Sequence, residues 1–384
     1  MDVLKAHSLT GRITEDLMHK AFKAVKKNRG AAGIDKVSIR MFERNREKNL
    51  NALMRDMKDG SFWPLPLRRE FIPKEPGKFR PLGIPAVRDR VAQEVVRRLI
   101  EPYFEPYFSP FSYGFRPGRN CHQAIAEALK RHKQGYYVVL DADIKGFFDN
   151  IPHSLIMKLV ARKIADGNIL RLIEKFLKSG VMEEGVFKKT EIGTPQGGVI
   201  SPLLANIVLD VLDKELARYG YIFVRYADDF IVLAKSRPEI EKAHEIVRSV
   251  IEGQLGLQLS PEKTKITTFG AGFNFLGFHF SGTRLTIRAK SMKKLQEKIK
   301  TLTIRSHNFS DDVIQEINAV LRGVANYYRL AGRSCVKTQF VTLDCLIRRR
   351  LRSMKSKRIS RDDNRKIPSR FFEKRGLVSL CSLL

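Results

Sequence analysis

Two apolar segments of this chain carry closely spaced aspartates, and this pairing constrains the fold more than any other feature. Residues 136–143 predict a buried strand that ends at Asp141 and Asp143. Residues 221–234 predict a hairpin of two β-rich runs with Ala227, Asp228 and Asp229 at its turn. Residues two apart in a strand point to the same face. We therefore expect a carboxylate of the first segment to meet the turn of the second across neighbouring strands.

Carboxylates gathered in this way repel one another, and low dielectric nearby makes the repulsion worse. A divalent cation removes that cost, and Mg²⁺ prefers a few carboxylate oxygens together with substrate phosphates. Two such ions together would form a two-metal site, in which one ion activates an attacking 3′-hydroxyl and the other holds a triphosphate with its leaving pyrophosphate. A solvated Asp-Asp turn is the alternative for the hairpin taken alone. Asp149 is better explained as a helix N-cap than as a ligand.

The charge of the chain predicts a polyanionic partner. Its 384 residues have a formal net charge of +30 and a pI near 10.1, an imbalance that opposes compaction unless Lys and Arg are neutralised. Residues 286–384 contain 24 Lys and Arg against 8 Asp and Glu, a net charge of +16. This segment predicts a second unit that grips a phosphate backbone. A solvated helical face is the alternative.

The sequence shows no sign of a membrane or secreted protein. The N-terminus has no apolar signal core, and polar residues interrupt the most apolar stretch, 199–212. The four cysteines form no paired motif. We expect a cytoplasmic protein with no membrane partner.

Periodicity and turn residues predict the order of elements. We expect strands at 69–73 and 79–84, helices at 89–100, 152–180, 201–218 and 237–255, and a single strand at 273–280. From about residue 290 the pattern is helical and basic.

These motifs together resemble the reverse transcriptases of group II introns. Beyond the two acidic segments, five blocks follow the family's order and extend the resemblance over roughly residues 15–350: Arg29 to Asp35, Tyr113 to Arg119, Thr194 to Asn206, Phe275 to Phe278, and Leu321 to Tyr328. The resemblance implies an α+β right-hand polymerase with fingers, a palm built on an antiparallel sheet, and a helical thumb. It places the N-terminal extension, the fingers and the start of the palm at 1–135, the palm at 136–285, a maturase-type thumb at 286–350 and a short basic tail at 351–384.

The resemblance also implies roles for individual residues. The catalytic metal ligands are Asp143, Asp228 and Asp229, binding two Mg²⁺ ions or Mn²⁺ in their place. Phe148 is the gate that excludes a ribose 2′-hydroxyl. The residues that bind the nucleotide are Lys74, Arg80, Gln196 and Lys263, and those that support the primer end are Phe275, Leu276 and Gly277.

The implied activity is RNA-directed DNA synthesis, with an RNA template, a DNA or RNA primer and deoxynucleoside triphosphates as partners, and intron RNA as a further one. The sequence after residue 350 contains no His/Cys metal motif of an endonuclease, so we do not expect autonomous DNA cleavage. Three alternatives remain open. They are a domesticated relative used in defence or DNA repair, an RNA-binding splicing factor with little polymerase activity, and an RNA-dependent RNA polymerase.

Overall fold

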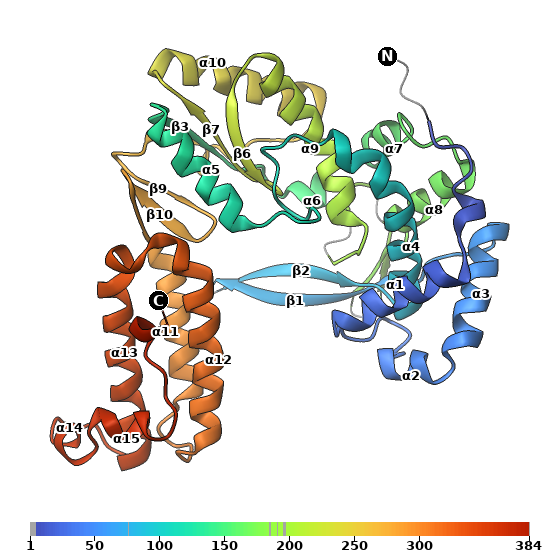
Figure 1. The fold of residues 1–384 in the computed structure, drawn as a ribbon. Coiled ribbons are helices and arrows are strands. Elements are labelled where there is room, and N and C mark those ends of the chain that lie inside the picture. The colour runs from blue at the N-terminus through green and yellow to red at the C-terminus, as the bar shows by residue number, and fades with distance from the viewer. Residues whose placement is uncertain (1–4, 76, 184–185, 190, 195–196, 384) are drawn as a thin grey trace. The chain divides into compact units, whose positions relative to one another are not determined.

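The fold mixes helices with small β-sheets in two compact units (Figure 1). The computed structural model describes residues 5–75, 77–183, 186–189, 191–194 and 197–383. The first unit comprises residues 1–124 and 140–265, and the second comprises residues 125–139 and 266–384. No helix in these described ranges is both long and apolar enough to cross a membrane.

Helices and a long hairpin make up the N-terminal part of the first unit. The elements in order are η1 (Thr10–Arg12), α1 (Glu15–Lys27), α2 (Ile39–Arg44), α3 (Arg46–Asp59), β1 (Leu67–Glu75), β2 (Lys78–Ile84), α4 (Val87–Phe104) and η2 (Glu105–Tyr107). α1 begins where the Thr14 side chain accepts a hydrogen bond from the Leu17 N–H. α4 is buried on several sides and contacts both α1 and α3. β1 and β2 confirm the two strands predicted at 69–84.

A second set of elements follows in the same unit. It contains α6 (Phe147–Asn150), α7 (His153–Val160), α8 (Gly167–Leu177), β4 (Val181–Glu183), β5 (Val186–Lys188), α9 (Ser201–Arg218), β6 (Ile222–Tyr226), β7 (Asp229–Ala234), α10 (Arg237–Arg248) and the π-helical η3 (Ser249–Gln254). β4 extends the first hairpin, giving the strand order β2-β1-β4-β5. α9 coincides with the predicted helix.

The central sheet carries both acidic segments. Its strand order is β6-β7-β3-β8, where β3 is Val138–Ala142 and β8 is Lys265–Thr268. β6 and β7 are antiparallel and β7 is the neighbour of β3. The hairpin turn and the end of β3 therefore belong to adjacent strands, as predicted. α9 and α10 contact each other, and α10 also packs on β7.

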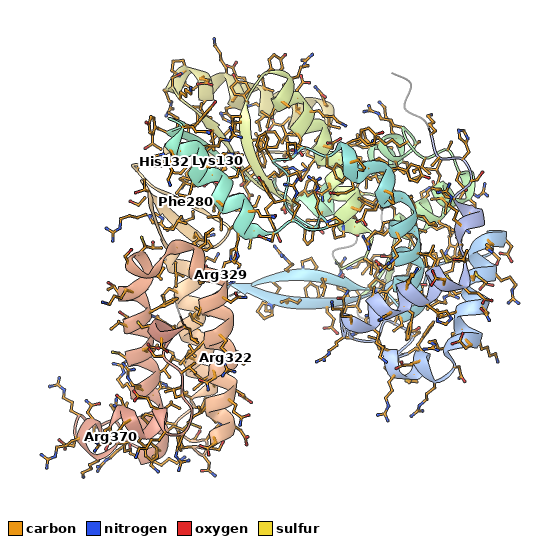
Figure 2. The ribbon with its side chains drawn as sticks, in the orientation of Figure 1. Lys130, His132, Phe280, Arg322, Arg329 and Arg370 are labelled. Carbon is orange, nitrogen blue, oxygen red and sulfur yellow. The ribbon has the colours of Figure 1, made fainter. Side chains whose placement is uncertain are left out.

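The second unit combines a small sheet with basic helices. Its elements are most of α5 (Cys121–Lys133), then β9 (Phe273–Phe275), β10 (Phe278–Ser281), β11 (Arg284–Ile287), α11 (Ala289–Leu302), α12 (Asp311–Tyr328), η4 (Arg329–Ala331), α13 (Arg333–Ser356), α14 (Asp363–Lys366), α15 (Ser369–Glu373) and η5 (Leu380–Ser382). α11 packs against both α12 and α13. Phe269 stacks on His132 and meets the edge of Phe280, so these rings form an aromatic core. Figure 2 labels two of the three residues, His132 and Phe280.

Several predicted elements need correction. Residues 273–280 form two strands, because Leu276 and Gly277 adopt positive φ angles of 47° and 80° and reverse the chain. The helix predicted at 152–180 is two helices, because Asp166 caps α8 by accepting hydrogen bonds from the Asn168 and Ile169 N–H groups. The helix predicted at 237–255 is α-helical only to Arg248 and then becomes π-helical.

The prediction for Asp149 was also wrong. Asp149 lies inside α6, whose N-cap is Gly146, and the next helix has Pro152 as its N-cap. Asp149 therefore caps neither helix.

Candidate active site

The turn of the β6–β7 hairpin is held in an unusual backbone conformation. Tyr226 pairs with Asp229, so Ala227 and Asp228 are the two residues of the turn. Ala227 has a φ of 57°, a left-handed conformation that non-glycine residues rarely adopt. Gly114 lies so close that a Cβ there would be 2.3 Å from the Ala227 nitrogen. The turn is therefore fixed by its surroundings rather than by its own preference.

Asp143 follows directly after β3 and is held by the segment before β8. Its N–H donates to Thr264 Oγ1 at 3.4 Å, and its carbonyl accepts from the Ser260 N–H at 2.8 Å. Its carboxylate forms an ion pair with Lys263, with 2.8 Å between Nζ and Oδ2. The Asp143 side chain is 41% exposed, so the carboxylate stays accessible to solvent and ligands.

Asp143 lies close enough to Asp228 to affect the ionisation of the Asp228 carboxylate. Burial is the main cause that raises the pKa of Asp228 above its ordinary value, and the negative charge of Asp143 raises it further. The positive charges of Arg80 and Arg225 act in the opposite direction. The structure thus gathers two carboxylates from adjacent strands and brings the charge of Arg80 within electrostatic reach.

Two carboxylates satisfy what Mg²⁺ needs from a protein when substrate phosphates and water complete its shell. Within the described ranges, no three His, Cys, Asp or Glu side chains form a group that could hold a metal ion. A metal that relies on a dedicated protein cage therefore does not fit here, whereas one shared with a nucleotide does. Asp229 is exposed at the start of β7.

Phe148 is anchored through its backbone to the loop that follows β5. Its carbonyl accepts a hydrogen bond of 2.7 Å from the Thr194 N–H, and its half-buried ring meets the edge of Phe147. His153 Nε2 lies 2.7 Å from the carbonyl oxygen of Gly193 in the same loop, and burial is the main cause that lowers the His153 pKa. The loop and the predicted gate therefore form one connected structure.

Of the four predicted nucleotide-binding residues, the structure describes the side chains of Arg80 and Lys263. Arg80 is exposed on β2 opposite Ile72, and Lys263 pairs with Asp143. The backbone of Lys74 belongs to β1, but its side chain lies outside the described part of the chain, as does all of Gln196.

The three predicted primer-support residues lie together in the second unit, where Phe275 ends β9 and Leu276 and Gly277 form the turn into β10. Phe275 is buried. The carbonyl of Leu276 accepts a hydrogen bond of 2.9 Å from the Tyr327 hydroxyl, and that of Gly277 accepts one of 3.3 Å from Tyr328. α12 therefore fixes this turn within its own unit.

Sequence reasoning missed a buried polar network behind the turn of the β6–β7 hairpin. Arg225 and Asp213 are both fully buried and form an ion pair, and Asn206 joins them. The signal was present, because Arg225 interrupts the apolar run of β6 and Asp213 interrupts the apolar face of α9.

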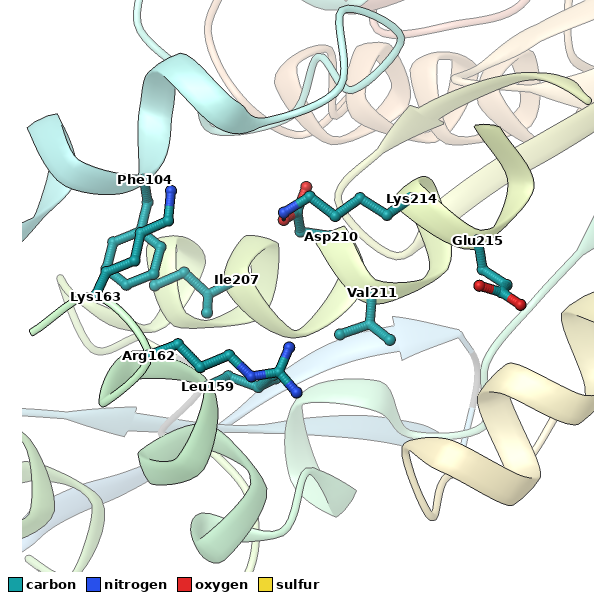
Figure 3. A pocket seen from close by; sticks show the side chains of 9 residues that line it. All are labelled: Phe104, Leu159, Arg162, Lys163, Ile207, Asp210, Val211, Lys214 and Glu215. Carbon is teal, nitrogen blue, oxygen red and sulfur yellow. Dashed lines mark hydrogen bonds and ion pairs between the residues drawn. The ribbon is translucent and has the colours of Figure 1, made fainter. Parts of the chain in front are cut away.

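A pocket of about 220 Å³ lies elsewhere in the first unit, between the end of α4 and the helices α7 and α9 (Figure 3). None of the predicted site residues lines it. Burial, followed by the charge of Lys214, lowers the pKa of Lys163 to about 8. We assign this pocket no part in the chemistry of the carboxylates.

Two family models match separate parts of the chain. The model described as reverse transcriptase (RNA-dependent DNA polymerase) matches residues 72–280. The group II intron, maturase-specific domain matches residues 292–372. Together they cover both acidic segments and the basic helices.

Two curated proteins are similar over most of their own length. Protein YkfC from Escherichia coli is 35% identical, covering 64% of this chain and 74% of that protein. The group II intron-encoded protein LtrA from Lactococcus lactis is 32% identical, covering 83% of this chain and 69% of that protein. Among solved structures, a telomerase from Candida albicans bound to a telomeric RNA fragment matches with 13% identity and a TM-score of 0.46, over 83% of this chain and 64% of that one.

The sequence matches confirm the predicted α+β polymerase fold and the family that the motifs indicated. The chain belongs to the reverse transcriptase family and carries the maturase-specific domain of group II introns.

Proposed function

We propose that this RNA-directed DNA polymerase adds deoxynucleotides to a primer 3′ end through two Mg²⁺ ions held by Asp143 and Asp228, with Asp229 beside them. Mn²⁺ would serve in their place. Family membership gives the activity, an RNA template and a primer. The residues and the number of ions are our proposal.

One observation carries the proposal, namely the proximity of the Asp143 and Asp228 carboxylates. Besides burial, the negative charge of Asp143 raises the pKa of Asp228, although the two residues are 85 positions apart in the sequence. Such repulsion is a cost that a binding-only protein has no need to bear, and divalent cations remove it.

The protein's own groups then have distinct tasks. The ions, when bound, would lower the pKa of the primer hydroxyl and neutralise charge on the transferring phosphate. Arg80 would pair with phosphate oxygens, since a guanidinium binds them in a bidentate manner. Lys263 would leave its ion pair with Asp143 and contact the nucleotide or the primer end instead. Lys74 and Gln196 would complete the nucleotide site. Residues 275–277 would support the primer end.

A second role concerns structured RNA. The maturase-specific domain lies on the basic helices of the second unit, where Arg322, Arg329 and Arg370 are all exposed (Figure 2). We propose that this surface holds the phosphates of intron RNA through shape and charge. A splicing factor with little polymerase activity and a relative used in defence or repair remain the competing proposals.

Primer extension on an RNA template with Mg²⁺ and deoxynucleotides tests the catalytic proposal. Asp228→Asn and Asp143→Asn should each reduce the rate by about a thousandfold or more, because each removes a ligand whose charge contributes several kcal/mol. Asp16→Asn, on the exposed face of α1, makes the same chemical change away from the site and should leave the rate unchanged. Full activity in Asp228→Asn would refute the assignment.

A further inference from the structure

Arg225 lies directly behind the catalytic turn and has no access to solvent. Its guanidinium donates from Nε to Asp213 Oδ1 at 2.8 Å and from Nη2 to Asp213 Oδ2 at 2.5 Å. Nη1 donates to Asn206 Oδ1 at 2.9 Å and to the carbonyl oxygen of Ala227 at 3.1 Å. One side chain thus connects α9 to the turn that presents Asp228.

The same network reaches a third segment of the chain. Asn206 Nδ2 donates to the Gly114 carbonyl at 2.9 Å. The Tyr113 N–H donates to the Arg225 carbonyl at 2.8 Å, and the Arg225 N–H donates to the Phe111 carbonyl at 2.9 Å. Residues 111–114 therefore lie along β6 and bring Gly114 against the Ala227 nitrogen.

The contacts of this network hold the turn in its strained conformation. Ala227 has a left-handed φ of 57°, which the surrounding contacts must enforce. Arg225 holds the Ala227 carbonyl from inside the core, while Gly114, which has no side chain, lets its backbone approach the Ala227 nitrogen. Asp228 is the next residue, so the direction of its carboxylate depends on both contacts.

We propose that Arg225 is a positioning residue, which fixes the Asp228 carboxylate for metal binding by holding the Ala227 carbonyl while Asp213 and Asn206 hold the guanidinium. The proposal rests on the metal role of Asp228 given above. A buried ion pair is weak evidence for stability, since apolar residues of similar volume often replace one without loss. The contact with Ala227 gives the pair a task that such residues cannot perform.

The decisive variant removes both charges together. Arg225→Met combined with Asp213→Leu removes both partners of the ion pair, so neither buried charge is left without the other, yet it deletes the bond to the Ala227 carbonyl. We expect thermal unfolding close to that of the wild type, a Mg²⁺ concentration for half-maximal primer extension raised about tenfold, and Mn²⁺ binding weakened to a similar extent. Free Mn²⁺ is measured by its electron paramagnetic resonance signal, so the binding readout does not depend on activity.

A matched control makes the same two changes in another ion pair. Arg131→Met with Glu127→Leu removes an i,i+4 pair on α5 and should leave the dependence on Mg²⁺ and Mn²⁺ unchanged. A folded Arg225/Asp213 variant that behaves like this control would overturn the proposal.

Arg225→Lys provides a second test if the double variant fails to fold. A lysine keeps the charge beside Asp213 but lacks the planar fork that reaches Asn206 and Ala227 at once. We expect a folded protein with weakened Mn²⁺ binding. If both variants unfold, Arg225 serves the fold alone and the proposal is overturned.

Asp228→Asn separates this inference from the proposed function. If Asp228→Asn keeps full activity and Mn²⁺ binding, the metal assignment itself fails. If Asp228→Asn loses both while the Arg225 variants keep both, only the positioning role fails.

Discussion

At the scale of single residues, the candidate site depends on backbone as much as on side chains. The hydrogen bond between the Phe148 carbonyl and the Thr194 N–H holds the backbone from which the Phe148 ring projects. A bulky ring beneath the sugar of a nucleotide tolerates deoxyribose and collides with a ribose 2′-hydroxyl. We therefore interpret Phe148 as the residue that sets DNA as the product.

Phe148→Ala should increase ribonucleotide incorporation relative to deoxynucleotide incorporation by at least about tenfold, because relieving one steric contact in a substrate pocket changes discrimination by roughly 1–3 kcal/mol. The measurement is kcat/KM for a ribonucleotide and its deoxy counterpart on the same primer and RNA template. Phe187→Ala, on the exposed strand β5, is the matched control. Unchanged rejection of ribonucleotides in Phe148→Ala would exclude the gate, and efficient ribonucleotide use by the wild type would favour an RNA polymerase.

At the scale of elements, the β6–β7 hairpin keeps its left-handed turn because a separate segment packs against that turn. Gly114 gives that segment a backbone thin enough to approach Ala227. The left-handed turn depends on the close approach of Gly114 to Ala227. The hairpin and residues 111–114 should therefore respond to mutation as one structural unit.

Gly114→Ala should reduce primer extension by about tenfold or more, because a Cβ placed 2.3 Å from the Ala227 nitrogen must displace the turn. Gly323→Ala, within α12, adds the same methyl group where it would meet nothing within 4 Å apart from its own helix backbone and chain neighbours, and it should keep full activity. Both variants are compared by primer extension and by thermal unfolding. A fully active Gly114→Ala would show that the turn tolerates the displacement.

The helix α4 contains a carboxylate whose burial gives stability a predictable pH dependence. Burial raises the pKa of Asp89 to about 6, although the Leu65 N–H donates to it at 2.9 Å. The folded chain then binds more protons than the unfolded chain between pH 4 and 6, so stability falls as pH rises through this window. Above pH 6 the ionised carboxylate costs up to about 3 kcal/mol.

Asp89→Asn should remove that cost while its amide oxygen still accepts from Leu65. We expect the variant to be more stable than the wild type at pH 7.5, with the difference shrinking as pH falls from 6 to 4. Urea unfolding at a series of pH values measures it. A constant difference across this range would contradict the assigned cause.

The sequence was sufficient for the parts of the fold that periodicity controls. The hairpin at 221–234, the helix at 201–218 and the adjacency of the two acidic segments follow from apolar patterning and from the two-residue period of a strand. The break at Leu276 and Gly277 was missed because a left-handed turn inside an apolar run leaves the pattern of hydrophobic residues unchanged. Arg225 escaped notice because a buried charge becomes intelligible only when its partner, twelve residues earlier, is seen beside it.

At the scale of the whole molecule, charge is distributed unevenly. The chain has a net charge of +30, and residues 286–384 supply +16 of it. The second unit places exposed arginines on α12, η4 and α15. Binding of RNA by such a surface releases counterions and weakens steeply with salt.

Arg322→Gln should weaken RNA binding to a similar extent for unrelated sequences and should lower the slope of log affinity against log salt concentration by about one. Filter binding or anisotropy across a salt series provides the measurement. Lys20→Gln, on the exposed side of α1, changes the net charge equally and should leave the slope unchanged. Equal slopes for wild type and Arg322→Gln would place the RNA surface elsewhere.

The ion pair between Lys263 and Asp143 has a consequence for the enzyme at rest. We propose that the Lys263 ammonium group offsets the repulsion between the Asp143 and Asp228 carboxylates until a metal ion binds. If the arriving ion displaces Lys263, the freed ammonium group would be available to the triphosphate that binds with the metal. Binding of the metal ion to Asp143 and binding of the nucleotide by Lys263 would then be coupled, because each replaces one partner of the same ion pair.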